Sequence, residues 1–462
     1  MAKRRGKKGR WKWVLAGAVL AVLTWALYGA TLLGPEVNVS LETDRPAIGP
    51  GTEVTARFET PRWGLGRVQL ILEQGDCREV LAEKVFSRPS PFSFKAEPAE
   101  ASAQLRATVG KGHPACLKEG QATLTARTDR ISGPLRSEAW SETRQELRVL
   151  FRPPVVQILS GQHYVKQGGS GIVAFHVSDT AVRSGVRAGD RTELSFPRPG
   201  GSPGDRICLF GIPWDLGDGG KVKVFAEDAA GNRSEASFIF GRQFKKSPPR
   251  RDVINLPESF LERVVPAIES QTPELDSSGS LIDRYLRINR DLRAANRAKV
   301  AEACAGSEAA VFWSGRFLQL KNSARRAGFA EARTYRYQGK VVDHQTHLGF
   351  DLASVAHAKV PAPNSGKVIF AGYLGIYGNV VILDHGYGLC SLCAHLSRID
   401  VSEGQSVTKG DLIGRTGATG LAGGDHLHLG IFIQGVAVDP MEWLDEHWID
   451  TRILPVLTGG GD

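Results

Sequence analysis

The sequence predicts a mainly β protein, and two observations support that fold class. The chain of 462 residues contains 53 glycines and 24 prolines, which favour turns, and only 8% of its residues are aromatic. Several segments alternate apolar and polar residues with a period of two, which is typical of strands that bury one face. One long apolar stretch occurs, close to the N-terminus. The length corresponds to roughly three domains.

The composition excludes several classes of protein. A hydrophobic fraction of 42% and a charged fraction of 23% are globular values, so the chain is neither wholly disordered nor a polytopic membrane protein. The formal net charge of +9 arises mainly at the N-terminus, where residues 3–12 hold seven basic residues and no acidic one. Without these seven charges the rest of the chain carries only +2, so no nucleic-acid partner is predicted.

An uncharged apolar stretch follows the basic tail of residues 1–12. As a helix, residues 13–34 would extend about 33 Å, which is enough to cross a bilayer. The positive-inside rule places the tail in the cytoplasm and residues 35–462 outside it. A cleaved signal peptide is the alternative, although the apolar run is long for one and no clean A-x-A site follows. The sequence therefore predicts a single-pass inner-membrane protein with a periplasmic C-terminal bulk.

Residues 35–151 and 154–241 are predicted to form two β-sandwich modules in tandem. Three segments of the first module alternate in hydrophobicity: 37–41, 52–58 and 122–127. After Pro153-Pro154 the pattern restarts in the second module. Its last hairpin, around Asp228–Asn232, is similar to the closing hairpin of bacterial immunoglobulin-like (Ig-like) modules. We expect any protein partner to bind through these modules, although architecture alone says little about function.

Two of the six cysteines lie in the first module. Cys77 and Cys116 could form a disulfide in an oxidising compartment, and two buried free thiols would account for them equally well.

Residues 242–310 are predicted to form a basic linker followed by a helical connector. Residues 242–251 contain five basic residues and two prolines. Further on, Ser280 and Asp283 have the spacing of a capping box. Apolar residues then recur at helical spacing: Leu281, Tyr285, Ile288, Leu292 and Ala295. This helix should pack on the next domain, and the chain returns to strands from about Phe312.

Histidines are concentrated in the C-terminal part of the chain. Eight of the 11 lie there: His344, His347, His357, His385, His395, His426, His428 and His447. Such a cluster beside carboxylates is what a metal site needs. The residues His426 and His428 open a strand-like run, so both rings should face one cleft. One imidazole could then bind a metal while the other transfers a proton.

The segment from His347 to Asp351 offers an imidazole and a carboxylate four residues apart. On an extended strand they would be about 13 Å apart, too far for one ion. The chain must therefore bend, and Gly349 permits a bend. Together with His428 they would form a set of two histidines and one carboxylate, which is the composition of a catalytic zinc site and also suits non-haem iron.

Residues 347–443 resemble the M23 (lysostaphin/LytM-like) zinc metallopeptidases of cell walls. The resemblance rests on these motifs, in order: His347–Asp351, Val360–Val368, Tyr377–Gly386, Ala394–Ser397, Val407–Gly414, Thr416–Gly420 and His426–His428. It implies a LytM-like, mostly antiparallel β peptidase domain, here residues 311–450, whose site lies in a groove floored by the sheet. Residues 451–462 are then expected to form a C-terminal tail.

The resemblance also implies a role for each site residue. His347, Asp351 and His428 would be ligands of Zn²⁺, and His395 and His426 would be catalytic groups beside it. Zinc activates water and polarises the scissile carbonyl. One of the two catalytic histidines would take the proton of the water, and the other would stabilise the oxyanion or protonate the leaving amine.

Other residues near these motifs are expected to have supporting or unrelated roles. His385 should be a turn or supporting residue, and His344, His357 and His447 are not expected to be ligands. Cys390 and Cys393 depart from the family pattern. Being three residues apart on a strand, they should not pair. Cys393 should share a face with His395 and line the groove, where zinc ligation by its thiol is a minor alternative.

The sequence therefore predicts a zinc-dependent endopeptidase that hydrolyses the peptide cross-links of bacterial peptidoglycan. The two sandwich modules would form a stalk between the inner-membrane anchor and the peptidase. That location suggests cleavage between D-Ala and a diaminopimelate residue of stem and cross-bridge peptides. All five site positions are filled, whereas some relatives that have lost ligands are amidase activators. The alternative is a catalytically masked LytM-domain regulator that activates another cell-wall hydrolase, with the connector covering its groove.

Overall fold

The computed structural model describes residues 10–32, 37–60, 65–86, 100–129, 140–161, 163–217, 220–243 and 250–459. Most of the predicted basic tail, the centre of the predicted linker and the last three residues lie outside these ranges. Strands account for 46% of the structure and helices for 18%, which confirms a mainly β fold. Contacts divide the chain into two compact units: Met1–Pro153 with Asp228–Asn232, and Pro154–Glu227 with Arg233–Asp462.

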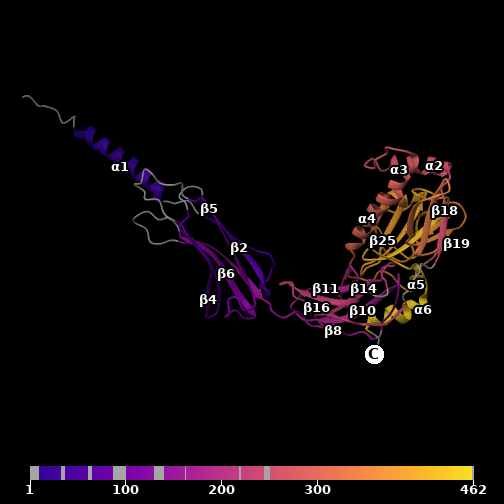
Figure 1. Ribbon diagram of the computed structural model, residues 1–462, viewed down its shortest axis with the longest axis horizontal. Helices are drawn as coiled ribbons and strands as arrows, with labels where there is room; N and C mark the ends of the chain where they lie inside the picture. Colours follow the sequence, from indigo (N-terminus) through magenta and orange to yellow (C-terminus); the bar gives the residue numbers. More distant parts are fainter. Residues whose placement is uncertain are drawn as a thin grey trace, which may run out of the picture. The chain divides into compact units, whose positions relative to one another are not determined.

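The N-terminal helix α1 spans Arg10–Leu32 and overlaps the predicted anchor, residues 13–34 (Figure 1). Within the described part of the chain, no helix combines the length and the apolar character needed to cross a membrane.

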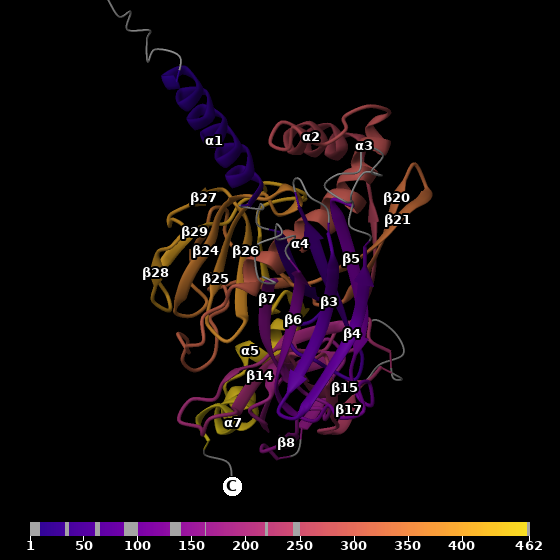
Figure 2. The same ribbon diagram turned by 90° about the vertical axis from the view of Figure 1, so that its left-hand side faces the viewer.

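The first unit contains two antiparallel sheets that share one core (Figure 2). Their strands are β1 Asn38–Thr43, β2 Thr52–Glu59, β3 Arg67–Gln74, β4 Cys77–Val85, β5 Ser102–Val109, β6 Gly120–Asp129 and β7 Trp140–Val149. The sheet orders are β1-β2-β5 and β4-β3-β6-β7. On β2, Val54, Ala56 and Phe58 are buried while their neighbours are more exposed, as the alternating pattern predicts. The unit is therefore a two-layer sandwich.

Two local features of the first unit bear on the sequence predictions: the pair of cysteines and the turn Asp228–Asn232. Cys77 and Cys116 are joined by a disulfide, so the alternative of two free thiols is wrong. By its contacts, the turn Asp228–Asn232 belongs to this unit. In it, Asp228 Oδ1 accepts hydrogen bonds from the backbone amides of Ala230 and Asn232, each at 2.9 Å. These bonds explain why aspartate occupies this turn.

The second unit begins with another pair of sheets. One contains β8 Val156–Ile158, β10 Ser170–Val177, β13 Phe196–Pro197 and β14 Asp205–Gly211; the other contains β11 Ala181–Ala188, β12 Arg191–Leu194, β15 Val222–Asp228 and β16 Arg233–Ala236. Strand β9 His163–Lys166 pairs in parallel with β17 Ile239–Gln243. Buried side chains such as Phe175, Phe210 and Val224 fill the space between the sheets. The Ig-like character of both sandwiches stays a prediction.

The second sandwich also packs against the C-terminal domain. Ile172 and Leu209, on strands β10 and β14, share a hydrophobic cluster with Trp443 of that domain. Trp443 Nε1 donates a hydrogen bond to Ser170 Oγ at 3.0 Å, and the Ser170 amide donates to Glu442 Oε2 at 2.6 Å. The second sandwich and the C-terminal domain therefore form one compact unit, and the role of the modules as a stalk stays a prediction. Strands β10 and β14 carry consecutive apolar residues because both of their faces are buried.

The connector begins with strand β18 Arg251–Asn255 and continues as helices α2 Glu258–Glu269 and α3 Leu281–Arg287, the π-helical turn η1 Ile288–Leu292 and helix α4 Arg293–Ala305. Ser280 and Asp283 form the predicted capping box. Tyr285 and Leu292 are buried as expected, but Ala295 is exposed. The π-helical turn adds a residue to the helix and rotates the face that follows it, so Asn296 is buried instead.

The C-terminal domain is built around one large, twisted sheet with the order β19-β22-β30-β26-β25-β24-β28. Its strands are β19 Ala324–Ala327, β22 Phe350–Ala353, β24 Gly366–Tyr373, β25 Asn379–Asp384, β26 Leu389–Leu396, β28 Ser406–Val407 and β30 Leu427–Ile433, with β31 Val436–Val438 paired to β30. Helices α2 and α3 lie together at one end of this sheet, and α4 runs along it (Figure 1).

Two smaller sheets and several short helices complete the domain. The sheets are β18-β20-β21, with β20 Glu331–Tyr337 and β21 Lys340–His347, and β23-β29-β27, with β23 Lys359–Pro361, β27 Arg398–Ile399 and β29 Leu412–Arg415. The helices are η2 Gly375–Tyr377, α5 Pro440–Leu444, α6 Glu446–Trp448, η3 Ile449–Ile453 and α7 Leu454–Thr458. Ile453 and Leu457 are buried, so the predicted C-terminal tail is instead helical up to Thr458 and packs through these two side chains.

Candidate metal centre

The bend predicted at Gly349 is present. Strand β21 ends at His347 and β22 begins at Phe350, so the chain changes direction between them. Asp351 then lies opposite His428 on the neighbouring strand β30. A Cβ atom on Gly349 would lie 2.6 Å from His428 Cε1 and 2.7 Å from the carbonyl oxygen of Leu429. Only glycine fits at this position, because the backbone passes directly against the His428 ring.

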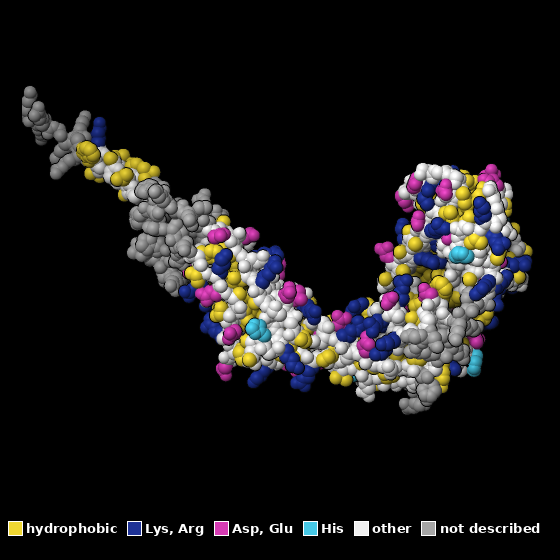
Figure 3. Space-filling model, in the orientation of Figure 1, with side chains coloured by type: hydrophobic (Ala, Val, Ile, Leu, Met, Phe, Trp, Pro, Cys, Tyr) yellow, Lys and Arg dark blue, Asp and Glu magenta, His cyan; other side chains and the backbone are white. Residues whose placement is uncertain are grey.

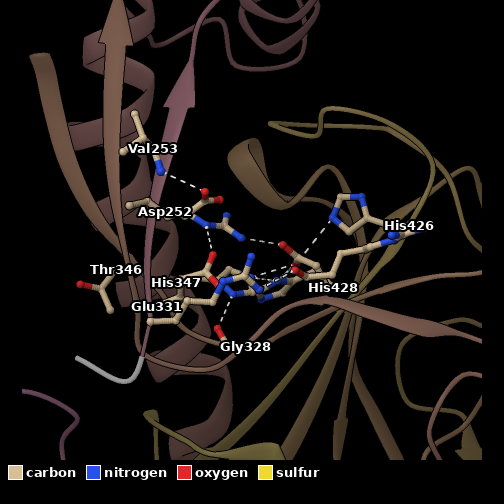
Figure 4. A network of polar contacts seen from close by, with 12 residues as sticks. Asp252, Val253, Gly328, Glu331, Thr346, His347, His426 and His428 are labelled. Atoms are coloured by element: carbon tan, nitrogen blue, oxygen red, sulfur yellow. Dashed lines mark hydrogen bonds and ion pairs between the residues drawn. The ribbon is translucent and has the colours of Figure 1, made fainter. Parts of the chain in front are cut away.

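Three donor atoms converge where these strands meet (Figure 4). His347 Nε2 and His428 Nδ1 each lie 2.9 Å from Asp351 Oδ1, and the two nitrogens are 3.0 Å apart. Within the described ranges, this is the one cluster of three or more His, Cys, Asp or Glu residues that could hold a metal ion. Two imidazole nitrogens and a carboxylate oxygen form a donor set that fits zinc.

Further contacts fix the orientation of these donors. His347 Nδ1 donates a hydrogen bond to the carbonyl oxygen of Gly328 at 2.8 Å. The lone pair of its Nε2 is therefore available to bind a metal. Arg333 Nη2 donates to Asp351 Oδ2 at 2.8 Å, which leaves Oδ1 for the centre. Arg333 is itself held by the buried carboxylate of Glu331, 3.4 Å from its Nε. These contacts therefore leave His347 Nε2 and Asp351 Oδ1 directed at the point where the three donor atoms converge.

The two predicted catalytic histidines flank this cluster. Their rings are 4.7 Å apart, and His426 Nε2 lies 3.6 Å from Asp351 Oδ1. His395 Nδ1 donates to the carbonyl oxygen of Thr419 and His426 Nδ1 to that of Gly424, both at 2.8 Å. A carbonyl oxygen only accepts, so both Nδ1 atoms carry a proton, and these two bonds leave both Nε2 atoms unengaged. His426 and His428 line one cleft, as their spacing predicts.

The surroundings set the charge states of the cluster. Burial opposes ionisation of Asp351, but its three histidine neighbours outweigh that effect and hold the pKa of its carboxyl well below the usual range. Burial lowers the pKa of His428 to about 4. Burial and the charges of His426 and His428 lower the pKa of His395 well below its ordinary value. Neutral imidazoles beside an ionised carboxylate are the forms that bind a metal.

Cys393 does not line the cleft, contrary to expectation. It is 1% exposed and belongs to the hydrophobic core, as does Cys390, and both are free thiols. The alternation along β26 is broken because its pairing with β25 shifts register between Asn379 and Val381. His395 adopts a left-handed conformation (φ 62°) at this irregularity, so it faces the cleft while Cys393 faces the core.

The remaining histidines stand apart from the centre. His385 is fully buried, with Nδ1 2.7 Å from the carbonyl oxygen of Ser365 and Nε2 2.8 Å from Ser391 Oγ, so it supports the sheet, as expected. None of the other three lines the cleft: His344, His357 and His447.

The centre lies in a cleft of about 700 Å³, part of whose wall the sequence did not reveal. Strand β18 and helices α2, α3 and α4 contribute side chains to it, among them Ile254, Phe260, Arg263, Tyr285 and Arg293. The amphipathic pattern predicts that the connector packs on the domain, and the regulator alternative places it over the groove, but neither indicates which side chains line the cleft. No motif marks these residues, so only the fold places them beside the metal centre.

A Gly349→Ala variant should bind zinc at least about tenfold more weakly than the wild type, because its methyl group would displace the His428 ring. Titration calorimetry with Zn²⁺ measures this difference. Gly306→Ala is the matched control, since a Cβ at Gly306 meets no atom within 4 Å. Unchanged zinc affinity in Gly349→Ala would contradict the proposed packing constraint.

The stability of the second unit should depend on the protonation of His385. Burial lowers the pKa of His385 from 6.5 to about 4, so between these values the unfolded chain binds a proton that the folded chain does not. Stability therefore falls as the pH falls through this window, by about 2 kcal/mol between pH 7 and pH 5. Denaturant unfolding of His385→Gln should show a pH dependence smaller by that amount. An identical pH dependence of stability in the wild type and in His385→Gln would refute this prediction.

The fold and the centre define a class: a β-sheet domain whose cleft holds two histidines and a carboxylate in position to bind a metal. Residues 345–440 match the family model described as Peptidase family M23. The chain therefore carries an M23 peptidase domain, which confirms the family that the motifs indicate.

Several curated proteins are similar over this region. DD-carboxypeptidase/endopeptidase Mpg of Neisseria meningitidis is 37% identical over 107 residues, 23% of this chain and 25% of its own. Peptidoglycan DD-endopeptidase ShyB of Vibrio cholerae is 34% identical over 116 residues, 25% of this chain and 26% of its own. Murein hydrolase activator EnvC of Escherichia coli is 34% identical over 110 residues, 24% and 26% respectively. The chain thus spans about a quarter of the length of these relatives.

Proposed function

We propose that this protein is a zinc-dependent endopeptidase that hydrolyses the peptide cross-links of bacterial peptidoglycan. The observation that carries the proposal is the convergence of His347, Asp351 and His428 in a cleft that His395 and His426 also line. The M23 match and the names of two relatives support a peptidase that acts on peptidoglycan. The same match favours zinc over the non-haem iron that this donor set also suits.

In the proposed mechanism, His347 Nε2, Asp351 Oδ1 and His428 Nδ1 would hold the metal. Zinc bound there would supply an activated water and a polarised scissile carbonyl. The Nε2 atom of His395 or His426 accepts the proton of the attacking water. The other imidazole stabilises the oxyanion or donates a proton to the leaving amine. Arg333 keeps the carboxylate of Asp351 in place.

Digestion of purified peptidoglycan tests this proposal. The zinc-loaded full chain should release uncrosslinked peptides, which mass spectrometry identifies together with the bond that is cut. We expect cleavage between D-Ala and diaminopimelate. The same digestion with His428→Ala is the control and should release nothing. A protein with one bound zinc per chain that releases no peptide would contradict the proposal.

The second candidate is a regulator that activates another cell-wall hydrolase. Two observations favour it: the connector forms part of the cleft wall, and one relative is named an activator. Such a protein would increase the activity of a purified amidase without releasing peptides itself. Deletion of residues 254–310 is unsuitable as a test, because it would remove buried core residues such as Leu261 and Tyr285. Point variants at the cleft wall are the appropriate choice.

We also propose that residues 13–34 anchor the protein in the inner membrane, with residues 35–462 in the periplasm. The uncharged sequence of this segment and the basic residues before it support the proposal. A disulfide between Cys77 and Cys116 fits an oxidising compartment. Protease treatment of intact spheroplasts should remove the C-terminal bulk, and recovery of a protected full-length chain would contradict this topology.

A further inference from the structure

The cleft over the metal centre has an unbalanced charge. Among the described residues that line it, three are arginines, Arg263, Arg293 and Arg333, and one is a carboxylate, Asp351. On the face shown in Figure 3, basic and acidic side chains are both spread over the second unit. The excess of arginine is therefore a property of the cleft, and a bound metal ion would add further positive charge.

Arg333 has carboxylate partners, whereas the other two arginines do not. Arg333 pairs with Asp351 and Glu331. In the part of the chain that the structure describes, neither Arg263 nor Arg293 forms an ion pair with an acidic side chain. Two guanidinium groups in the cleft thus remain available for an anionic ligand.

Arg263 is exposed on helix α2, where it can reach a bound molecule. Its Nη2 donates one hydrogen bond, to the carbonyl oxygen of Ala422 at 3.2 Å, which spans the cleft between α2 and the glycine-rich loop before β30. A guanidinium has five N–H donors in a planar fork, so most of its hydrogen-bonding capacity is unused.

Arg293 lies at the start of helix α4 and is half-buried. It is held within its own helix, because Nε donates to the carbonyl oxygen of Asn289 at 3.0 Å and Nη2 to Asn289 Oδ1 at 2.6 Å. Both acceptors are neutral, so its charge is not compensated. The fixed position of this cation suits recognition of an anion at a defined place.

We propose that Arg263 and Arg293 bind a free carboxylate of the substrate and make the enzyme selective for peptides that carry one near the scissile bond. This inference rests on the proposed function and adds the chemical group that is recognised. Hydrogen bonds from a guanidinium to a carboxylate contribute enough to change affinity by about 10- to 100-fold. Neutral cross-bridge peptides would lack this contribution.

A pair of synthetic peptides tests the proposal. Each is a dimer of stem peptides joined by a D-Ala–diaminopimelate bond; in one the carboxylates near that bond are free, and in the other they are amidated. With the zinc-loaded full chain, kcat/KM should be about 10- to 100-fold higher for the acidic peptide. Arg263→Gln should remove most of this preference, because it should lower kcat/KM for the acidic peptide far more than for the amidated one. Arg336→Gln, at an exposed arginine of β20 that does not line the cleft, should behave like the wild type.

Binding measurements separate this inference from the proposed function. In a His395→Ala background, calorimetry should show tighter binding of the acidic peptide, and Arg263→Gln or Arg293→Gln should weaken it. Equal cleavage and equal binding of the two peptides would overturn carboxylate recognition while leaving the peptidase intact. If the zinc-loaded protein cleaves neither peptide nor peptidoglycan, the proposed function fails, and the binding preference alone then decides this inference. Zinc content and melting temperature establish that each variant is folded.

Discussion

Replacing His428 with alanine is expected to abolish zinc binding and, with it, peptide hydrolysis. The substitution removes Nδ1, which lies 2.9 Å from Asp351 Oδ1 and 3.0 Å from His347 Nε2. Two donors, His347 and Asp351, would remain, which is too few for a stable zinc site. The loss of affinity should exceed the roughly 10- to 100-fold that follows removal of a residue that only supports a ligand.

Metal analysis after dialysis measures this effect directly. The wild type should retain one zinc per chain and His428→Ala none, and peptide release should fall below detection. His344→Ala is the matched control, because its ring lies outside the cleft and contacts Thr334 Oγ1 at 3.3 Å. One tightly bound zinc per chain in His428→Ala would show that the ligand set is a different one.

The centre could be predicted from sequence because its geometry depends on local rules. Residues two apart on a strand share a face, which places His426 and His428 in one cleft. A four-residue separation between His347 and Asp351 requires a bend, and glycine at position 349 allows it. The M23 resemblance then supplies the roles that these local rules cannot give, including that of His395.

Other features could not be predicted because they depend on irregular backbone or on distant parts of the chain. The register shift near His395 reverses the alternation that would bring Cys393 into the cleft. The π-helical turn before Arg293 moves the buried face away from Ala295. Neither irregularity leaves a distinct pattern in the residues around it.

Packing between distant parts of the chain also could not be predicted from sequence patterns. The apolar runs of β10 and β14 indicate burial on both faces, but not that Trp443 covers one of them. Similarly, the connector carries Arg263 and Arg293 into the cleft although more than 50 residues separate them from His347. The residues expected to select the substrate thus lie outside the matched segment 345–440.

Replacing His395 with alanine is expected to differ from His428→Ala in zinc binding: zinc is retained although turnover is lost. His395 contributes no donor to the converging cluster, and its Nδ1 is engaged by the carbonyl oxygen of Thr419. Removal of its Nε2 takes away a proton-transfer group, which should lower kcat by about 10²- to 10⁴-fold. Zinc content and kcat measured on the same preparation separate the two effects.

His426→Ala and the double variant extend this test. If His395 and His426 act in the same catalytic step, the loss in the double variant should be smaller than the product of the two single losses. His447→Ala, on the exposed helix α6, is the matched control and should leave kcat unchanged. A zinc-loaded, fully active His395→Ala protein would exclude this residue from catalysis. The proton would then have to pass through His426, whose Nε2 lies 3.6 Å from Asp351 Oδ1.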